Sequence, residues 1–410
     1  MNSRIFQNIL LLAACCVIGV LTFECVSFFF IKQSPRSYGL FLKRDLPPFK
    51  IKLLDNPNAE DDKAINDVVV NNQKITWGDL RGVAREDEIL GYAPMENRVS
   101  RNGWWQSNNL GATSREDTEA KTPPGKKRVI IFGESFANCW GVPLEESWPF
   151  FMNKKSGKWE IVNFAVSGYS MGQCLLRFEN IKQKLDYDKV ILAFVPSVDL
   201  WRDVNVLRQL RGWAKGPVMP RFIVDHDQLK LVQSPYKTWR DALEDNASGI
   251  SETLKRHLQA YDRFYSSSQY ESPPGIGALV SYKLLASVIH DFKEKLLLRN
   301  MGRPGSEARA VTQRIIERMN NETKRAGKEF ILVYIPTKED IGYYKNNRAF
   351  ARQYDEMVLS TSRLGITAID LMKDLVKADP LQMDCSYDGS HYGPKANKMI
   401  AELLWRYFLL

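Results

Sequence analysis

From residue 128 onward, short apolar runs alternate with segments of helical spacing. The apolar runs are rich in β-branched residues and cover residues 129–132, 161–165, 190–195, 329–335 and 366–371. Between and after them, the spacing of apolar residues predicts helices over residues 149–155, 172–185, 306–325, 350–364 and 394–410. A chain that alternates strands and helices in this rhythm predicts a mostly parallel sheet with helices on both faces. The expected fold is therefore a three-layer α/β/α sandwich.

This rhythm is interrupted between about residues 200 and 305. Within that stretch, residues 220–232 alternate apolar and polar around a polar turn, a pattern typical of a β-hairpin. Helical and polar segments follow the hairpin. We interpret residues 200–305 as an insertion into one α/β domain that spans residues 128–410, and we expect it to cover the active site.

Residues 5–31 form one long apolar run near the N-terminus. A membrane core of about 30 Å needs about 20 helical residues, so the run is long enough to span it. No small-residue cleavage site closes the run, which favours an uncleaved anchor over a secretory signal. Leu12-Ala-Ala-Cys15 resembles a lipoprotein cleavage site, but cleavage there would leave a second long apolar stretch. We predict a single-pass anchor over residues 1–31, in a plasma or inner membrane.

Glu24 stands inside this apolar run, where a charge at mid-membrane costs on the order of 3 kcal/mol or more. A span shifted toward Ile5 would bring Glu24 to the interface; protonation of Glu24, or pairing with another membrane protein, are the alternatives. Basic residues flank both sides of the run, so charge alone does not fix its orientation.

Residues 32–127 are rich in proline, asparagine and charged residues, and predict a juxtamembrane linker with a small β-containing extension.

The formal net charge is +9, but the basic residues are scattered and form no nucleic-acid-binding motif. We therefore expect a solvated basic surface and no nucleic acid partner, with attraction to anionic lipid or acidic glycan left open.

There is no Cys-x-x-Cys and no Cys/His cluster with zinc spacing, so we expect neither a metal nor a cofactor. Cys139, Cys174 and Cys385 are expected to be free thiols, a Cys139–Cys174 disulfide being the alternative.

Candidate chemistry lies at the two ends of the α/β pattern. Asp388 and His391 are three residues apart near the C-terminus, and the sequence has only four histidines. A carboxylate at this spacing can orient an imidazole, which can then take a proton from a nucleophile. Ser135 follows an apolar strand and Gly133, and so lies at the carboxyl end of a parallel strand, where active sites form. A capped turn and an N-cap serine would explain each motif separately, but their order within one α/β pattern favours a shared site.

These residues resemble the conserved blocks of the SGNH (GDSL) hydrolases, in particular their membrane-anchored members. Gly133-Glu134-Ser135 with Gly141-Val142-Pro143 resembles the first block, and Asp388-Gly-Ser-His391 resembles the last. Asn163-Phe-Ala-Val-Ser-Gly168 resembles the second block, and Asn109-Leu-Gly-Ala-Thr-Ser-Arg115 resembles a stretch upstream of the serine in anchored members. The resemblance covers about residues 90–410 apart from a variable middle. It is specific at the first and last blocks.

The resemblance implies a flavodoxin-like fold of SGNH type and a role for each matching residue. Ser135 would be the nucleophile, His391 the general base and Asp388 the residue that orients it. The backbone N–H groups of Ser135 and Gly168 would form the oxyanion hole. The implied reaction is acyl transfer through an acyl-serine, with water as acceptor in an esterase and a sugar hydroxyl as acceptor in an O-acyltransferase.

Two positions depart from the family pattern. Glu134 replaces the aspartate of the first block, and we expect it still to hold the turn. Val198 stands where the third block has an asparagine whose amide completes the oxyanion hole, and losing such a donor costs on the order of 100- to 1,000-fold in rate. Asn138, or a group from the insertion, are candidate substitutes.

We expect an ester hydrolase first, an O-acyltransferase second, and a non-catalytic domain used for binding or assembly third. The implied substrate belongs to the cell envelope, such as an O-acylated glycan or a lipid ester. This expectation places the catalytic domain outside the cytoplasm.

Overall fold

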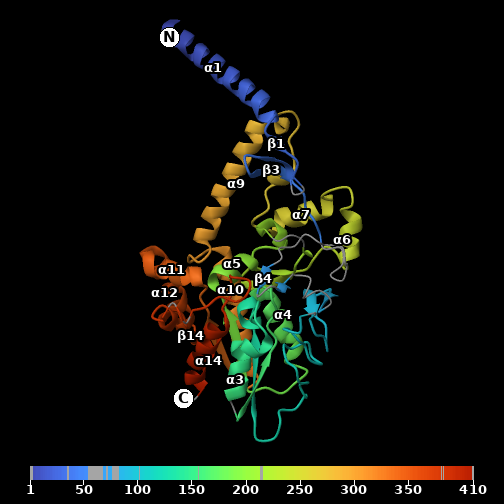
Figure 1. Cartoon of the computed structure of the whole chain (residues 1–410), viewed down its shortest axis with the longest axis vertical. Helices are drawn as coiled ribbons and strands as arrows, with labels where there is room; N and C mark the ends of the chain where they lie inside the picture. The colour runs from blue at the N-terminus through green and yellow to red at the C-terminus, as the bar shows by residue number, and fades with distance from the viewer. Residues whose placement is uncertain are drawn as a thin grey trace. The chain divides into compact units, whose positions relative to one another are not determined.

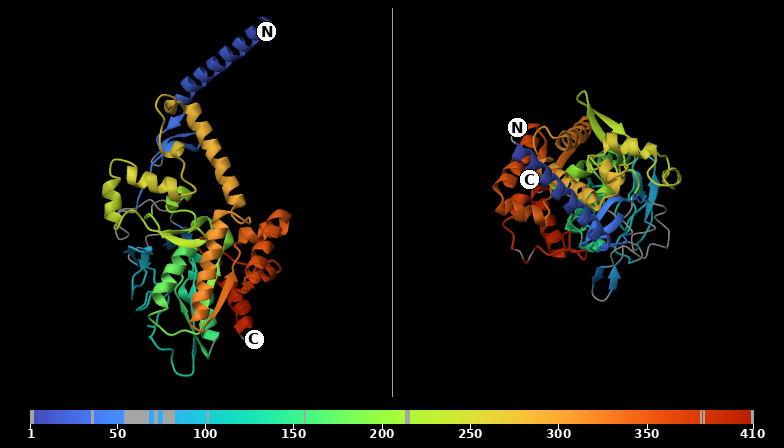
Figure 2. Two further views of the ribbon diagram at one scale, coloured as in Figure 1. Left: turned by 180° about the vertical axis from the view of Figure 1, so that it is seen from behind. Right: turned by 90° about the horizontal axis from the view of Figure 1, so that it is seen from above.

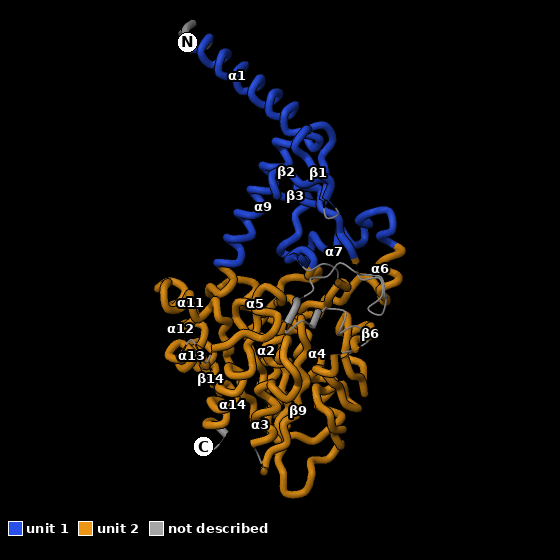
Figure 3. Tube along the Cα trace, viewed as in Figure 1, with its two compact units in different colours: residues 1–52, 209–212, 245–299 blue, residues 53–208, 213–244, 300–410 orange. Residues whose placement is uncertain are grey.

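The structure is a computed structural model that describes residues 3–34, 37–53, 68–70, 73–75, 83–100, 102–155, 157–212, 216–379, 381 and 383–408. The chain divides into two compact units (Figure 3). Unit 1 contains residues 1–52, 209–212 and 245–299, and unit 2 contains residues 53–208, 213–244 and 300–410. Residues 245–299 of the expected insertion thus group with the N-terminal residues.

Unit 2 is built on a five-stranded parallel sheet. Its strand order is β14-β13-β10-β8-β9. The first strand of this sheet, β8, thus lies between the second, β9, and the third, β10, as in flavodoxin-like folds. The three central strands, β8, β10 and β13, are almost wholly buried, because a sheet covered on both faces needs apolar residues on both. The five strands are β8 Lys127–Phe132, β9 Trp159–Asn163, β10 Lys189–Phe194, β13 Glu329–Tyr334 and β14 Thr367–Asp370.

Helices cover both faces of this sheet. α3 (Trp148–Lys155) and α14 (Pro394–Phe408) pack together on one face (Figure 1). α4 (Met171–Ile181) and α10 (Glu307–Arg325) lie side by side on the other (Figure 2), and Arg309 of α10 donates to Ser360 of α12 (Arg348–Arg363). The expected three-layer α/β/α sandwich with a parallel sheet is confirmed. The expected strands and helices are present, with ends that differ by a few residues.

The remaining elements of unit 2 are short. The expected hairpin is confirmed as β11 and β12, which pair antiparallel around a turn at His226 and Asp227. Residues 54–67 and 76–82 of the expected N-terminal extension lie outside the described residues. The other described elements are β4 Val68–Val70, β5 Gln73–Ile75, β6 Ala84–Asp87, β7 Gly91–Pro94, α2 Ser135–Asn138, α5 Pro196–Arg202, β11 Arg221–Asp225, β12 Gln228–Val232, α6 Trp239–Asp245, α11 Lys338–Asn346 and α13 Met372–Leu375.

Unit 1 contains a long apolar helix and a small sheet. Within α1, residues Gln7–Phe28 have a mean hydropathy of 2.6 and are long and apolar enough to cross a membrane. Part of the expected linker forms a three-stranded antiparallel sheet, whose Phe41 and Leu46 pack against Val280. These contacts join residues more than 200 positions apart in the chain, so local pattern did not reveal the sheet. The elements are α1 Ser3–Phe28, β1 Ile31–Lys32, β2 Ser37–Phe41, β3 Arg44–Phe49, α7 Glu252–Tyr261, α8 Ser267–Tyr270 and α9 Val280–Asn300.

Glu24 has its hydrogen-bond partners in the same unit. Its two carboxylate oxygens accept the backbone N–H groups of Val280 and Ser281, each at 2.7 Å. These N–H groups belong to the first turn of α9, where a helix has no partners of its own for them and favours negative charge. Within this chain, Glu24 thus has hydrogen-bond donors of its own, and pairing with another membrane protein, one of the three alternatives for this residue, is not needed to satisfy its carboxylate.

Candidate active site

Ser135, His391 and Asp388 meet at the carboxyl end of the parallel sheet. Ser135 Oγ lies 2.8 Å from His391 Nε2, and His391 Nδ1 lies 2.6 Å from Asp388 Oδ2. Because an ionised carboxylate only accepts, Nδ1 carries the proton, and Nε2 is left to accept the proton of the serine. The structure thus brings Ser135 together with Asp388 and His391, which lie about 250 positions later in the sequence. This order of contacts is the one that an acyl-transfer triad requires.

A sharp turn after β8 positions Ser135. Gly133 ends the strand, and a Cβ at this position would lie 2.8 Å from Ala137 Cβ and 2.9 Å from Ala193 Cβ, so only glycine fits. Glu134 then caps the short helix α2, because its Oε1 accepts the backbone N–H of Phe136 at 2.7 Å. Glutamate therefore holds the turn in place of the family's aspartate, as expected.

The loop before α14 positions Asp388 and His391. Asp388 Oδ1 accepts the backbone N–H groups of Ser390 and His391 and the hydroxyl of Ser386, at 2.5–3.1 Å. The His391 ring also packs against Phe136, with 4.7 Å between ring centroids. These contacts fix the imidazole from both sides, so the site is preorganised.

Asp388 is held in its charged form. Burial acts to raise the pKa of this carboxyl, but the hydrogen bond and charge of His391 and the Ser386 hydroxyl outweigh it, and the pKa falls well below its ordinary value of 3.8. A depressed folded pKa contributes stability that is present above the unfolded pKa and is lost as the pH falls through the folded pKa. Mild acid therefore leaves Asp388 ionised.

We predict that the activity of the site falls at acid pH because of His391 and not because of Asp388. A protonated imidazole cannot accept the Ser135 proton. The pH profile of kcat/KM checks this expectation, and a flat profile through the range where histidines titrate would contradict a histidine base. As a control, the melting-temperature difference between the wild type and Asp388→Asn should stay constant down to about pH 4 and shrink below it.

The second block lies against the nucleophile helix. Asn138 Oδ1 accepts the Ser167 hydroxyl at 3.1 Å, and Asn138 Nδ2 donates to Ala165 O at 3.1 Å and to Thr113 Oγ1 at 3.0 Å. Gly168 follows with a φ of +84°, a conformation that favours glycine. Within the described part of the chain, the backbone N–H groups of Ser135 and Gly168 donate no hydrogen bond. Both remain candidates for the oxyanion hole.

Asn138 does not replace the missing asparagine of the third block. Both hydrogens of its amide are already donated to Ala165 and Thr113, so the side chain ties loops together. Val198 lies half-buried in the first turn of α5, and the neighbouring Asp199 is fully buried and accepts the N–H of Val195 at 2.7 Å. The suggestion that Asn138 substitutes is therefore wrong, and the third donor is absent from the residues that resemble this block.

Sequence reasoning missed Arg202. It lies on α5 one turn after Val198, and its Nη1 donates to Glu134 Oε2 at 3.1 Å. Glu134 Oε2 also lies 2.5 Å from Ser135 Oγ, so an arginine–glutamate pair contacts the nucleophile. The available signal was its spacing: Arg202 follows Val198 by four residues on a helix, so the two side chains lie on the same face of that helix.

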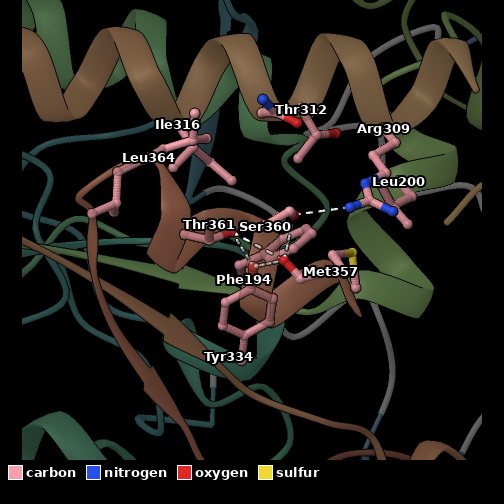
Figure 4. A pocket seen from close by; sticks show the side chains of 12 residues that line it. Phe194, Leu200, Arg309, Thr312, Ile316, Tyr334, Met357, Ser360, Thr361 and Leu364 are labelled. Atoms are coloured by element: carbon pink, nitrogen blue, oxygen red, sulfur yellow. Dashed lines mark hydrogen bonds between the residues drawn. The ribbon is translucent and has the colours of Figure 1, made fainter. Parts of the chain in front are cut away.

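A small pocket lies elsewhere in unit 2, between α10, α12 and the sheet (Figure 4). Its lining includes Arg309, Tyr334 and Met357, and none of the three triad residues. Tyr334 and Arg309 are hydrogen-bonded to Thr361 and Ser360 within it. The pocket is separate from the candidate active site.

Among the described residues, no group of histidines, cysteines or acidic residues is placed to hold a metal ion.

Solved structures similar to this chain include a member of the lipolytic protein G-D-S-L family from Veillonella parvula DSM 2008, at 11% identity over 69% of this chain and 98% of that one, with a TM-score of 0.32. The acetyl xylan esterase AlAXEase matches at 12% identity over 68% and 98%, with a TM-score of 0.36. The psychrotrophic esterase EstA from Pseudoalteromonas sp. matches at 11% over 68% and 96%, with a TM-score of 0.32. At these values the likenesses do not by themselves assign an activity. No family model matches the sequence, and no curated protein matches it.

Proposed function

We propose that this protein is an ester hydrolase of SGNH type that acts through an acyl-Ser135 intermediate. The observation that carries the proposal is the continuous hydrogen-bonded chain from Asp388 through His391 to Ser135. In the first half-reaction, Ser135 Oγ attacks the ester carbonyl while His391 takes the serine proton and returns it to the leaving alcohol. In the second, His391 takes a proton from water while the water oxygen attacks the acyl carbonyl, and it then returns this proton to Ser135 Oγ as the acid leaves.

Two backbone donors would stabilise the oxyanion in this mechanism. These donors are the backbone N–H groups of Ser135 and Gly168. The asparagine amide that the third block would add is absent here, because Val198 stands at that position. Because one donor accounts for on the order of 100- to 1,000-fold in rate, we expect a slow enzyme.

The protein is proposed to act at a membrane. The apolar helix α1 supports a single membrane-spanning segment. The proposed arrangement is an uncleaved anchor in a plasma or inner membrane with the catalytic unit outside the cytoplasm, as the resemblance to membrane-anchored SGNH hydrolases implies. Glu24 is consistent with a span over α1, because it lies near the C-terminal end of this helix and its carboxylate accepts the N–H groups at the start of α9.

An O-acyl glycan is the substrate class that we favour over a lipid ester. The half-buried rings of Trp104 and Tyr387 lie 4.9 Å apart, and Tyr387 directly precedes Asp388. Backbone hydrogen bonds from Leu144 to Trp104 and from Tyr387 to Gly141 hold both aromatic residues against the loop after α2. Large, flat apolar faces with polar edges suit the faces of sugar rings.

Trp104→Ala is expected to lower the preference for a sugar ester about 3- to 10-fold, because stacking contacts contribute about 0.5–1.5 kcal/mol. The measurement is the ratio of kcat/KM for xylose tetraacetate to that for p-nitrophenyl acetate. Trp105→Ala is the matched control, since Trp105 is the next half-buried residue of the same loop. An equal ratio in wild type and Trp104→Ala would remove the support for a glycan.

Hydrolysis and transfer are separated by supplying an acceptor. The full chain in detergent is given p-nitrophenyl acetate with and without a soluble xylo-oligosaccharide, and Ser135→Ala serves as the blank. A hydrolase releases acetate in step with nitrophenol in both cases. Acetate that falls behind nitrophenol while the sugar gains acetyl groups would show that the acyl-serine passes its acyl group to a hydroxyl.

A further inference from the structure

The Arg202 side chain connects the two loops that carry the candidate oxyanion donors. Its Nη1 donates to Glu134 Oε2 at 3.1 Å and to the backbone carbonyl of Tyr169 at 3.2 Å. Glu134 directly precedes Ser135, and Tyr169 directly follows Gly168. One guanidinium therefore bonds to the neighbours of both N–H groups.

Glu134 transmits this contact to the nucleophile itself. One of its oxygens caps α2 through the N–H of Phe136, and the other accepts from both Ser135 Oγ and Arg202. The serine hydroxyl thus has two acceptors, Glu134 Oε2 at 2.5 Å and His391 Nε2 at 2.8 Å. The position of the glutamate sets how the hydroxyl is shared between them.

The surroundings make this pair a strong constraint. Glu134 is 1% exposed and Arg202 is 7% exposed, so water screens the pair little. The nearby Asp199 does not take over as the ion-pair partner, because burial, and after it the charge of Glu134, raise the pKa of Asp199 well above its ordinary value and favour its neutral form. The ion pair that Arg202 makes is with Glu134, at 3.1 Å.

We propose that Arg202 is a positioning residue that holds the Glu134–Ser135 turn and the Gly168 loop in register, and thereby compensates for the asparagine that Val198 replaces. In the resembled family, the helix that follows the third strand supplies an oxyanion donor from the position of Val198. Here the same helix, one turn later, supplies a side chain that fixes the two remaining donors. The inference rests on the proposed function, because it concerns the same site.

Arg202→Lys tests the inference with the full chain. A lysine keeps the charge but lacks the planar fork, so it cannot hold both partners in the same geometry. We expect kcat for p-nitrophenyl acetate to fall about 10- to 100-fold, as for other small displacements of reacting groups, while KM changes less than about 3-fold. The rate of fluorophosphonate labelling at Ser135 should fall in parallel.

Arg128→Lys is the matched control. Arg128 is fully buried and donates to the Glu160 carboxylate and to backbone carbonyls, as Arg202 does to Glu134 and Tyr169. It stands at the opposite end of β8 from Ser135. A loss of kcat that is equal in the two variants, or that follows the melting temperature, would mean that Arg202 has only a structural role and would overturn the inference.

Glu134→Gln removes the carboxylate that Arg202 contacts. This variant tests the same ion pair if Arg202→Lys does not fold. It should show the same loss of kcat, and the double variant should lose no more than either single one. Additive losses, or a fully active Glu134→Gln, would contradict the inference. If the wild type shows no Ser135-dependent turnover or labelling, the proposed function fails, and the inference fails with it.

Discussion

Ser135→Ala and His391→Ala are each expected to lower kcat for ester hydrolysis on the order of 10⁴- to 10⁶-fold. Without the serine there is no acyl-enzyme, and without the imidazole the serine keeps its proton. Because Ser135 Oγ and His391 Nε2 lie 2.8 Å apart and act as one unit, the double variant should be no slower than the slower single variant. Initial rates with p-nitrophenyl acetate check both statements.

The controls for this prediction leave the site intact. Ser114→Ala removes a hydroxyl that bonds to the Glu116 carbonyl, and His226→Asn replaces an exposed histidine in the β11–β12 turn. Both should retain the wild-type rate. A folded Ser135→Ala or His391→Ala variant with near-wild-type turnover would mean that the arrangement is structural, and the binding or assembly alternative would then take its place.

Val198→Asn is expected to raise the esterase rate about 10-fold or more. Val198 is half-buried in the first turn of α5, where the third block of the resembled family supplies an amide donor. One oxyanion donor is worth on the order of 100- to 1,000-fold where its geometry is ideal, and an introduced amide should recover part of this. The rate of acyl-serine formation with p-nitrophenyl acetate measures the gain.

Val198→Asp is the matched control, because aspartate has nearly the shape of asparagine but its carboxylate offers no donor. Its negative charge would oppose an oxyanion, so the rate should fall below that of the wild type. A Val198→Asn variant that folds normally and shows no gain would mean that Val198 does not occupy the position of the third-block asparagine.

The architecture was readable from the sequence because its signals are local. Each buried strand of the parallel sheet is a short, continuous apolar run, and each covering helix repeats its apolar residues at helical spacing. The residues of the triad were also readable, since Asp388 and His391 share one turn and Ser135 follows a strand. Their mutual distances were not, because they depend on how the first strand and the last loop meet in space.

The features that the sequence did not reveal depend on contacts between distant segments. The three-stranded sheet of unit 1 packs on Val280 of α9, and Glu24 finds its partners at the first turn of the same helix. Arg202 was missed for a related reason: its partners Glu134 and Tyr169 precede it in the chain by 33 residues or more. Asn138 was misjudged because a free amide and a fully bonded amide look alike in a sequence.

The most direct test of the central claim is fluorophosphonate labelling of the full chain, with the modified residue mapped by mass spectrometry and with Ser135→Ala alongside. The reagent forms a bond between Ser135 Oγ and phosphorus and releases fluoride only if His391 activates the serine and the oxyanion site accepts the charge. We expect one adduct, at Ser135, that is lost in Ser135→Ala. Folded wild-type protein that stays unlabelled, or is labelled equally in Ser135→Ala, would contradict a serine esterase at this site.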